Sequence, residues 1–416
     1  MVQYNVSPLV KSLPASGIRK FFDMAGQDEN MISLGVGEPD FATPERVRAA
    51  CIRALESGQT MYTPNAGLME LREEIAHYLG SSFQLNYEPK DEILVTVGSS
   101  EAIDLAMRTL ICSGDEVLIP VPSYIAYSPI VALQGGSIVN VETHEQEQFK
   151  LTAQSLREKI TPRSKVLLIN YPNNPTGAVM SYEDWLPITE LVKAHNLIVV
   201  SDEVYAELTY ESQHVSIASL PGMQERTIVI NGFSKAFAMT GWRIGYACGP
   251  VEIISQMLKI HQYTAMCAPI MGQIAALESL RSGLADKDLM KEAYKQRRAM
   301  FVGGLQQLGL SCHMPEGAFY AFPSIAHTGL SSEQFAFKLM KEAGVAVVPG
   351  HVFGPGGEGR IRCSYSVSSA KLSEALERMG CYMSQTRQAH VAAVGAGRRL
   401  MGTERKGLGK EGEERR

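Results

Sequence analysis

The stretch NGFSKAFAMTGWRIGY, residues 231–246, places a lysine, a hydroxyl group and an arginine close together, directly after the apolar run RTIVI. In water a lysine has a pKa of about 10.4 and is a poor nucleophile at neutral pH. Partial burial and a nearby cation would lower the pKa of Lys235 and free its amine to form a Schiff base. Ser234 and Arg243 suit a phosphate monoester, because a guanidinium presents a fork of donors. The alternative is a solvated loop that carries a few charges.

Polar residues also follow three other apolar runs. In VTVGSSEAIDL a strand leads into a helix, and Ser99 and Ser100 either help to bind an anion or cap the helix. In NYPNNPTG, Asn174 lies in a turn from which its amide can donate to a ligand oxygen. In LIVVSDEVY, Asp202 ends an apolar strand, where a carboxylate is either exposed or paired with a cation or a protonated group.

Arg362 lies in the apolar strand GRIRCSYS, and a buried arginine needs an anion such as a substrate carboxylate. With the residues above, it completes a set of an amine, a phosphate cradle, a carboxylate for a pyridine nitrogen and donors for a phenolic oxygen. Pyridoxal phosphate requires all of these groups. The sequence therefore favours an enzyme that uses this cofactor.

The composition of the chain excludes several classes of protein. Of its 416 residues, 45% are hydrophobic and 20% charged, as in an ordinary globular protein. A formal net charge of −5 argues against a nucleic-acid partner, which would require a basic face. No apolar run approaches the roughly 18 residues that span a bilayer, and the N-terminus lacks the apolar core of a secretory signal. The seven scattered cysteines predict reduced thiols, a cytoplasmic location and no metal site.

Short apolar runs alternate with amphipathic stretches in the middle of the chain. This alternation predicts a parallel sheet that helices cover on both faces, with ligands at the carboxyl ends of the strands. Helices are expected at 100–111 and at 183–196, where Pro187 either kinks the helix or marks a boundary. Strands are expected at 92–97, 115–120, 136–141, 165–170, 197–202 and 227–232.

The character of the sequence changes twice. From about residue 290 an α+β pattern begins with the helical stretch KEAYKQRRAMFVGGLQQLG and predicts a smaller second domain. After residue 385 the chain is rich in Gly, Arg, Lys and Glu, which predicts a disordered or loosely attached tail. We expect an N-terminal segment (1–45) packed on the small domain, a large cofactor-binding domain (46–290), a small C-terminal domain (291–385) and a tail (386–416).

Over nearly all of residues 10–384 the chain resembles the fold-type I aminotransferases of class I/II. Its sequence is especially similar to the bacterial group that includes N-acetyl-L,L-diaminopimelate aminotransferase. Relatives of that group also act on aromatic or acidic amino acids. The resemblance implies an α/β large domain with a mostly parallel seven-stranded sheet between helices, and a smaller α+β domain. The matching motifs are SLGVGEPDFATP, YTPNAGLMELR, VTVGSSEA, NYPNNPTG, SDEVYAEL, GFSKAFAMTGWRIGY, PEGAFYAFP, VVPGHVFG and IRCSYS.

The resemblance also implies a role for each residue of the site. Lys235, Asp202 and Tyr205 are the expected catalytic residues: Lys235 forms an aldimine with pyridoxal phosphate and carries the proton, and Asp202 keeps the pyridine nitrogen protonated. Tyr205 and Asn174 bond the phenolic oxygen. The remaining expected contacts are Tyr124 on the ring; Ser99, Ser100, Ser234, Arg243 and, from a second subunit, Tyr62 on the phosphate; and Arg362, Asn174 and the backbone of Gly37 on the substrate.

The implied function is the ping-pong transfer of an amino group from an L-amino acid to a 2-oxo acid such as 2-oxoglutarate, in a homodimer with shared active sites. A carbon–sulfur β-lyase on the same scaffold is the alternative. A DNA-binding regulator is disfavoured because residues 1–30 are too short for a DNA-binding head, and a nicotinamide-dependent dehydrogenase because no glycine fingerprint occurs.

Glu101 stands where aspartate-specific relatives can carry a lysine. A carboxylate at this position would repel a second substrate carboxylate. The other interpretation is a helix N-terminal residue that the macrodipole favours.

Overall fold

The computed structural model describes residues 4–13 and 30–385. The predicted tail 386–416 and part of the predicted N-terminal segment lie outside these ranges. Within them, no helix combines the length and the apolar character needed to cross a bilayer.

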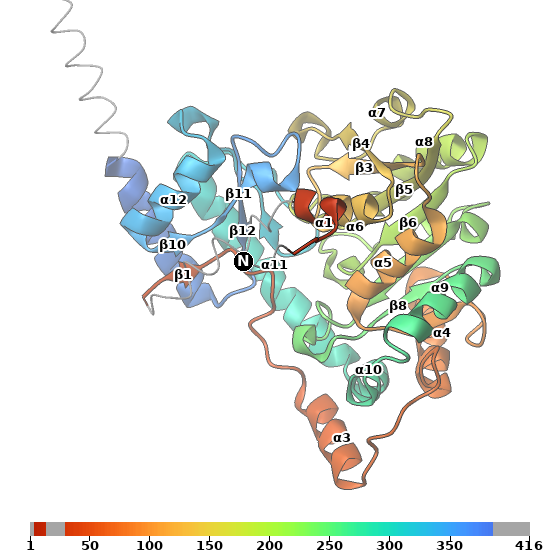
Figure 1. The fold of residues 1–416 in the computed structure, drawn as a ribbon. Helices are drawn as coiled ribbons and strands as arrows, with labels where there is room; N and C mark the ends of the chain where they lie inside the picture. Colours follow the sequence, from red (N-terminus) through yellow and green to blue (C-terminus); the bar gives the residue numbers. More distant parts are fainter. Residues whose placement is uncertain (1–3, 14–29, 386–416) are drawn as a thin grey trace, which may run out of the picture.

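A seven-stranded sheet forms the centre of the molecule, with helices on both sides of it (Figure 1). Its strands lie in the order β2-β8-β7-β6-β5-β3-β4. The pairs β2–β8 and β8–β7 are antiparallel and all other pairs are parallel, so the predicted mostly parallel sheet is confirmed. The strands are β2 (Ile93–Thr96), β3 (Glu116–Val121), β4 (Ser137–Glu142), β5 (Ser164–Asn170), β6 (Ile198–Asp202), β7 (Thr227–Gly232) and β8 (Gly245–Cys248).

Side chains of β5 alternate between the two faces of the sheet, as the two-residue period of a strand requires. Leu167 and Ile169 pack with Trp185 of α8, whereas Val166 and Leu168 pack with the helices of the opposite face. Both faces are apolar because both are covered, which explains the near-continuous apolar runs. The helices around the sheet are α3 (Glu45–Glu56), α4 (Met69–Phe83), α5 (Gly98–Leu110), α6 (Tyr127–Leu133), α7 (Ala153–Arg157), α8 (Tyr182–Ala194), α9 (Val251–Thr264) and α10 (Ile270–Ser282).

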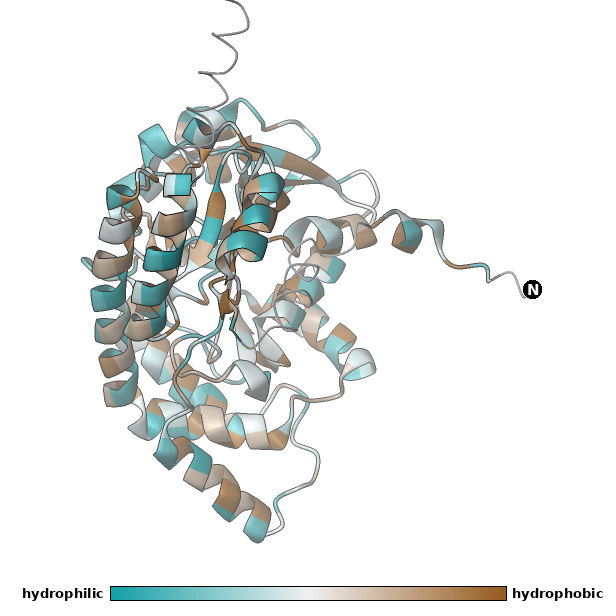
Figure 2. Ribbon diagram, turned by 90° about the vertical axis from the view of Figure 1, so that its left-hand side faces the viewer, coloured by the Kyte–Doolittle hydropathy of each residue, from teal (hydrophilic) through white to brown (hydrophobic). Residues whose placement is uncertain are grey.

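The helices carry hydrophilic and hydrophobic residues in alternation along their length (Figure 2). Helix α8 begins with a capping box, in which Ser181 accepts from the backbone N–H of Asp184 and the Asp184 side chain accepts from that of Ser181. Pro187 lies inside this helix rather than at a boundary. Proline removes one N–H donor and crowds the carbonyl four residues earlier, and the well-capped first turn and the buried face of α8 offset this cost.

Strand β8 was not expected from the sequence. It has only four residues and follows directly on the loop that carries Lys235. Its short apolar run therefore could not be distinguished from the end of that motif. It pairs with the end of β7 through Asn231 and Tyr246 and through Gly232 and Gly245. Residues 233–244 therefore form the loop of an antiparallel hairpin.

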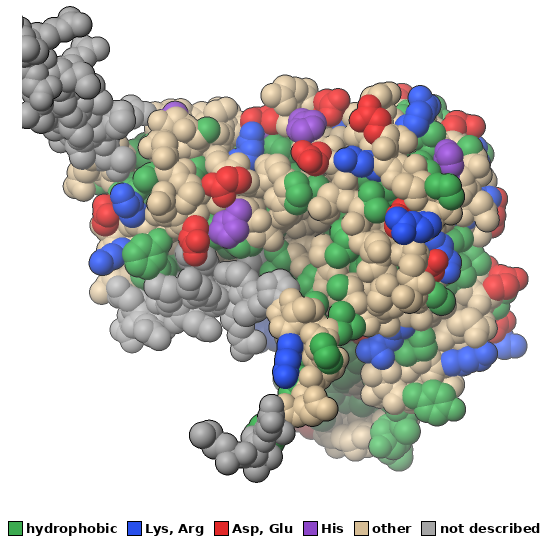
Figure 3. All heavy atoms as spheres, turned by 45° about the horizontal axis from the view of Figure 1, so that its top comes forward, with side chains coloured by type: hydrophobic (Ala, Val, Ile, Leu, Met, Phe, Trp, Pro, Cys, Tyr) green, Lys and Arg blue, Asp and Glu red, His purple; other side chains and the backbone are tan. Residues whose placement is uncertain are grey.

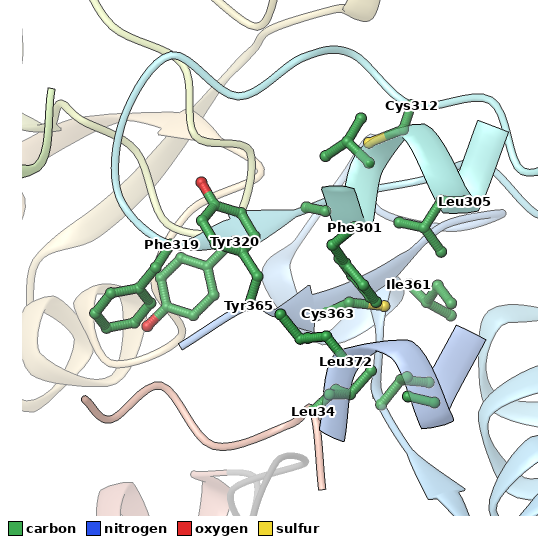
Figure 4. Packing of buried hydrophobic residues seen from close by; sticks show 14 of the residues in the cluster. Leu34, Phe301, Leu305, Cys312, Phe319, Tyr320, Ile361, Cys363, Tyr365 and Leu372 are labelled. Atoms are coloured by element: carbon green, nitrogen blue, oxygen red, sulfur yellow. The ribbon is translucent and has the colours of Figure 1, made fainter. Parts of the chain in front are cut away.

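The C-terminal region has its own sheet and its own apolar cluster (Figure 4). Helix α11 begins at Leu284, earlier than predicted, because Lys287, Met290 and Tyr294 continue its buried face towards the N-terminus. Further helices and strands are α1 (Pro8–Ser12), β1 (Ile32–Ser33), α11 (Leu284–Gln307), β9 (Tyr320–Ala321), α12 (Ser332–Ala343), β10 (Val345–Ala346), β11 (Val348–Pro349) and β12 (Ile361–Ser364).

The N-terminal segment contacts two parts of the molecule. Strand β1 pairs with β10, and the backbone of Leu34 bonds both Ala346 and Ser364 of the C-terminal region. Helix α1 instead contacts α6, beside the central sheet. We keep the domain boundaries near 45 and 290 as a proposal, the second of them inside α11.

On the face that Figure 3 shows, positive and negative side chains lie interspersed over the surface. On this face the charged side chains do not gather into a basic patch of the kind that a nucleic acid would need.

Candidate active site

A cavity of about 630 Å³ lies at the carboxyl edge of the central sheet, between the sheet and the C-terminal region. The structure brings every predicted site residue except Tyr62 to this cavity. They are Gly37, Ser99, Ser100, Tyr124, Asn174, Asp202, Tyr205, Ser234, Lys235, Arg243 and Arg362.

Lys235 lies half-buried in the hairpin loop between β7 and β8. Its Nζ donates to the backbone carbonyl of Gly37 over 2.6 Å. Burial, followed by the nearby charge of Arg362, lowers the pKa of this ammonium to about 8. At neutral to slightly alkaline pH a useful fraction of the amine is therefore uncharged, which a nucleophilic amine requires. The plain alternative of a solvated loop is wrong.

Arg243 ends the same loop with a left-handed backbone, φ 55°. Its guanidinium lies against Gly98 at the start of α5, where a β-carbon would meet Nη2 at 2.5 Å. Gly98 also has a positive φ of 77°, so glycine is required there both for the backbone and for space. The structure thus stacks a cation on the N-terminus of a helix, which is a favourable place for an anion.

Ser99 and Ser100 do not cap α5, contrary to one of the two interpretations of the sequence. The helix begins at Gly98 with Val97 at the N-cap position, so both serines lie in its first turn. Ser99 Oγ donates to the carbonyl of Asn231 over 3.1 Å, while Ser234 is buried. Both serines of α5 and Ser234 line the same cavity as Arg243.

Glu101 does not line the cavity. Its carboxylate accepts from the backbone N–H of Val97 over 2.5 Å and lies 2.9 Å from Nδ1 of His261 on α9. This geometry favours the interpretation as a helix N-terminal residue, which ties the first turn of α5 to α9.

Asp202 ends β6 and is only 5% exposed, so the interpretation as an exposed carboxylate is wrong. Tyr127 donates to its Oδ2 over 2.6 Å, and the backbone N–H of Val204 donates to its Oδ1 over 3.2 Å. Burial raises the pKa of Asp202 to about 6, against the effect of the Tyr127 hydrogen bond. A cationic partner in the cavity would relieve this desolvation.

Asn174 and Arg362 meet across the cavity. Arg362 is 3% exposed, and its guanidinium donates to Asn174 Oδ1 over 3.0 Å and to the carbonyl of Gly35 over 2.6 Å. Its Nε is buried without a hydrogen-bond partner among the described residues. Because a buried unpaired donor is unfavourable, this atom indicates an acceptor supplied by a ligand.

Tyr205 and Tyr124 are the aromatic residues that the sequence placed in the site. Tyr205 Oη lies 2.7 Å from Tyr320 Oη. Tyr124 is half-buried, with its ring edge-on to that of Tyr127 at 5.5 Å.

Tyr62 is 82% exposed and lies outside the cavity of this chain. The nearby side chain of Asn65 donates to the carbonyl of Met266 and so holds this loop at the end of α9. The predicted contact of Tyr62 with the cofactor of a second subunit stays a prediction.

Three residues of the site were missed from the sequence. Tyr127 positions the Asp202 carboxylate, and Tyr320 contacts both Tyr205 and Arg362. Asn170 bonds the carbonyl of Asp202 and the backbone N–H of Asn174, each over 2.9 Å, and so joins two neighbouring strand ends. The signal for Tyr127 was its position three residues after Tyr124, in the segment that follows strand β3.

The cavity fits pyridoxal phosphate on grounds of its own geometry. A cation on a helix N-terminus matches the phosphate, the buried Asp202 matches a pyridinium, and the amine of Lys235 lines the same cavity. Among the residues that the structure describes, no cluster of three or more acidic, histidine or cysteine side chains is suited to a metal ion.

Comparison with known families decides the assignment. The family model "Aminotransferase class I and II" matches residues 29–379. The chain belongs to this family. It is an aminotransferase with the fold-type I architecture, and its cofactor is pyridoxal phosphate.

Individual relatives are similar over almost their full length. A Bacillus subtilis protein provisionally named an aminotransferase, YugH, is 54% identical over 92% of this chain and 99% of its own. A second B. subtilis protein, provisionally named N-acetyl-LL-diaminopimelate aminotransferase, is 43% identical over 93% and 98%, which confirms the predicted resemblance to that group. An aspartate aminotransferase of Pyrococcus abyssi is 45% identical over 88% and 94%.

Among solved structures, the aromatic aminotransferase of Pyrococcus horikoshii superposes with a TM-score of 0.85 at 43% identity, over 88% of this chain and 99% of that one. The names of these relatives cover three classes of amino donor at nearly equal similarity. Similarity therefore shows the reaction and leaves the donor open.

Proposed function

We propose that this aminotransferase moves the amino group of an N-acetyl-diaminopimelate-like, aromatic or acidic L-amino acid to a 2-oxo acid such as 2-oxoglutarate, by a ping-pong mechanism. The observation that carries the proposal is the amine of Lys235, with its pKa lowered to about 8, in one cavity with the buried Arg362 and its unpaired Nε.

Each side chain has a definite task in this scheme. Arg362, with the backbone of Gly37, would bind the α-carboxylate of the substrate and orient its α-carbon. Lys235 Nζ, released from the Gly37 carbonyl, would take the proton from that carbon and return it on the other side of the reaction. Pyridoxal phosphate supplies an electron sink for the resulting negative charge.

The cofactor would be held by groups at the strand ends. Arg243, Ser99, Ser100 and Ser234 would hold its phosphate, and Asp202 would keep a proton on the ring nitrogen, with Tyr127 fixing the orientation of the carboxylate. The phenolic oxygen would face Tyr205 and Asn174, and Tyr124 would stack on the ring.

The position of Glu101 bears on the choice of donor. Its carboxylate is engaged by Val97 and His261 and lies outside the cavity lining, so it gives no reason to disfavour a donor with a second carboxylate. Acidic donors therefore stand level with aromatic and N-acetyl-diaminopimelate-like donors in this proposal.

A panel of amino donors against 2-oxoglutarate tests the proposal, with N-acetyl-L,L-diaminopimelate, aspartate, phenylalanine and alanine as donors. We expect glutamate to form with at least one of the first three, and the donor's 2-oxo acid to form in equal amount. Lys235→Ala should abolish turnover, whereas Lys338→Ala, at an exposed position of α12, should leave it unchanged. Pyruvate and ammonia released from cystathionine without any oxo acid would instead support the β-lyase.

We further propose a cytoplasmic homodimer in which Tyr62 of each chain reaches the other chain's cofactor phosphate. Met61, Tyr62 and Tyr263 support it, because they are 77%, 82% and 93% exposed on this chain. Sedimentation analysis should give twice the chain mass, and Tyr62→Phe should weaken cofactor binding. A fully active monomer would contradict the proposal.

A further inference from the structure

Tyr320 of β9 is a buried residue, 1% exposed, that contacts both halves of the site. Its ring lies beneath Arg362, with 4.4 Å between the ring centroid and Cζ of the guanidinium. Its hydroxyl lies 2.7 Å from that of Tyr205. Figure 4 shows it next to Phe319 at the edge of the C-terminal apolar cluster.

The ring of Tyr320 limits the movement of Arg362. The guanidinium also lies over the ring of Phe353, whose centroid is 5.0 Å from Cζ, while Asn174 and Gly35 accept from its two terminal nitrogens. A desolvated cation gains attraction from such aromatic faces. The ring therefore holds the arginine in the plane in which it would meet a carboxylate.

The hydrogen bond between the hydroxyls of Tyr320 and Tyr205 allows two arrangements of their protons. Burial raises the pKa of both phenols above the ordinary value, so both keep their protons at neutral pH. If Tyr205 donated to Tyr320, it would turn a lone pair towards the phenolic oxygen of the cofactor. If Tyr320 donates, the proton of Tyr205 is free to point to that oxygen, and the two bonds strengthen each other.

The backbone of Gly37 packs closely against the Tyr320 hydroxyl. A β-carbon at position 37 would lie 2.1 Å from Tyr320 Oη, so only glycine permits the observed packing. The carbonyl of the same glycine accepts from Lys235. One tyrosine thus contacts residues proposed to bind the cofactor oxygen and residues proposed to bind the substrate carboxylate.

We propose that Tyr320 is a positioning residue with two separable parts, a hydroxyl that directs Tyr205 towards the cofactor and a ring that fixes Arg362 for the substrate carboxylate. This inference rests on the roles proposed above for Tyr205 and Arg362. It predicts that the two parts can be removed one at a time.

The test uses the cofactor-loaded enzyme with Tyr320→Phe, Tyr320→Leu and the matched control Tyr365→Phe, whose buried hydroxyl donates to the carbonyl of Ala318 outside the cavity lining. Two quantities are measured: the pKa of the pH titration of the cofactor's visible absorbance, and KM for 2-oxoglutarate. Tyr320→Phe should raise the absorbance pKa by several tenths of a unit, because Tyr205 then donates more weakly and stabilises the deprotonated phenolic oxygen of the cofactor less. The same substitution should leave KM for 2-oxoglutarate within about twofold of the parent value.

Tyr320→Leu should raise the absorbance pKa and also raise KM roughly tenfold, because it removes the aromatic face from Arg362. Tyr365→Phe should change neither quantity. Equal effects of Tyr320→Phe and Tyr365→Phe on the absorbance pKa would overturn the hydroxyl part, and an unchanged KM in Tyr320→Leu would overturn the ring part.

The outcome stays interpretable if the proposed function itself fails. A parent enzyme that loads cofactor but does not transaminate would refute the proposed function, while the absorbance titration would still decide the hydroxyl part. If Tyr320→Leu does not fold, Tyr320→Met, which removes the aromatic face but keeps an unbranched apolar side chain, decides the ring part: an unchanged dissociation constant of 2-oxoglutarate in this variant overturns it.

Discussion

The two arginines of the cavity are held in opposite ways. Arg243 lies exposed at the end of a hairpin loop with a left-handed backbone, and its Nη1 donates to the nearby carbonyl of Thr240. Arg362 is buried in a strand, lies over two aromatic rings and bonds two other segments. Arg243 is therefore placed by the backbone of its loop, and Arg362 by the packing of its surroundings.

Because of this difference, replacing each arginine should affect anion binding and the stability of the fold to different degrees. Replacing an exposed, loop-held cation should remove affinity for an anion and little else. Replacing a buried cation leaves its acceptors, Asn174 Oδ1 and the Gly35 carbonyl, without a donor, and so should reduce stability as well as activity.

The largest effect is expected for Arg362→Leu. It should lower kcat/KM roughly a thousandfold and also lower the midpoint of urea unfolding of the cofactor-free protein, because two buried acceptors lose their partner. Arg362→Lys should recover part of the stability but little activity. A guanidinium can donate to both protein acceptors and to the substrate carboxylate from one plane, whereas an ammonium cannot. A stable, fully active Arg362→Leu would contradict the assignment of Arg362 as a buried cation needed for both stability and activity.

Arg243→Gln should raise the dissociation constant of pyridoxal phosphate roughly tenfold to a hundredfold, the value of a charge-assisted hydrogen bond. The urea midpoint of the cofactor-free chain should stay unchanged. Pyridoxal without its phosphate serves as the control ligand, because its affinity should not respond to the substitution. A drop in stability equal to that of Arg362→Leu would contradict the assignment of Arg243 as a loop-held cation.

Asp202→Asn adds a pH test to the cofactor side of the comparison. Because burial raises the pKa of Asp202 to about 6, the folded chain keeps a proton there that the unfolded chain has released above about pH 4. The stability of the cofactor-free protein should therefore fall as the pH rises from about 4 to about 6. Asp202→Asn should flatten that fall in urea titrations while it weakens cofactor binding, and an unchanged pH profile would refute the buried titration.

The smallest effect is expected for Glu101→Gln. It keeps an acceptor for the Val97 N–H but weakens the contact with His261, so we expect a loss of about 1 kcal/mol in the free energy of unfolding. The ranking of amino donors should not change. A shift in that ranking towards acidic donors would show that Glu101 acts on the substrate after all.

Site residues that directly follow a strand could be predicted from the sequence. Site residues that act through contacts with other elements could not. Lys235, Asp202 and Asn174 could be found because each follows an apolar run, and parallel strands bring their carboxyl ends to one edge. The contact of Tyr320 with Arg362 could not, since β9 and β12 pair in an antiparallel register that no local pattern reveals. Tyr127, the first residue of α6, was missed because its partner, Asp202, lies 75 residues away at the end of β6.

The errors at element boundaries have a similar cause. Serines after a strand are good N-caps, yet the N-cap position of α5 is Val97, whose N–H donates to the Glu101 side chain, and the chain turns into the helix at Gly98 with a positive φ. The sequence shows neither the backbone angle of Gly98 nor the tertiary partner of Glu101.

The reversed direction of β8 has a consequence for insertions and deletions. Because β8 runs antiparallel to its neighbours, the residues just before it reach the same edge of the sheet as the residues just after β7. Loop 233–244 is fixed at both ends by the pairing of Gly232 with Gly245, and the spacing between Lys235 and Arg243 is set by its length. A change of one residue in that length would move the amine relative to the phosphate cation, so natural relatives should vary in this loop by substitution and keep its length constant.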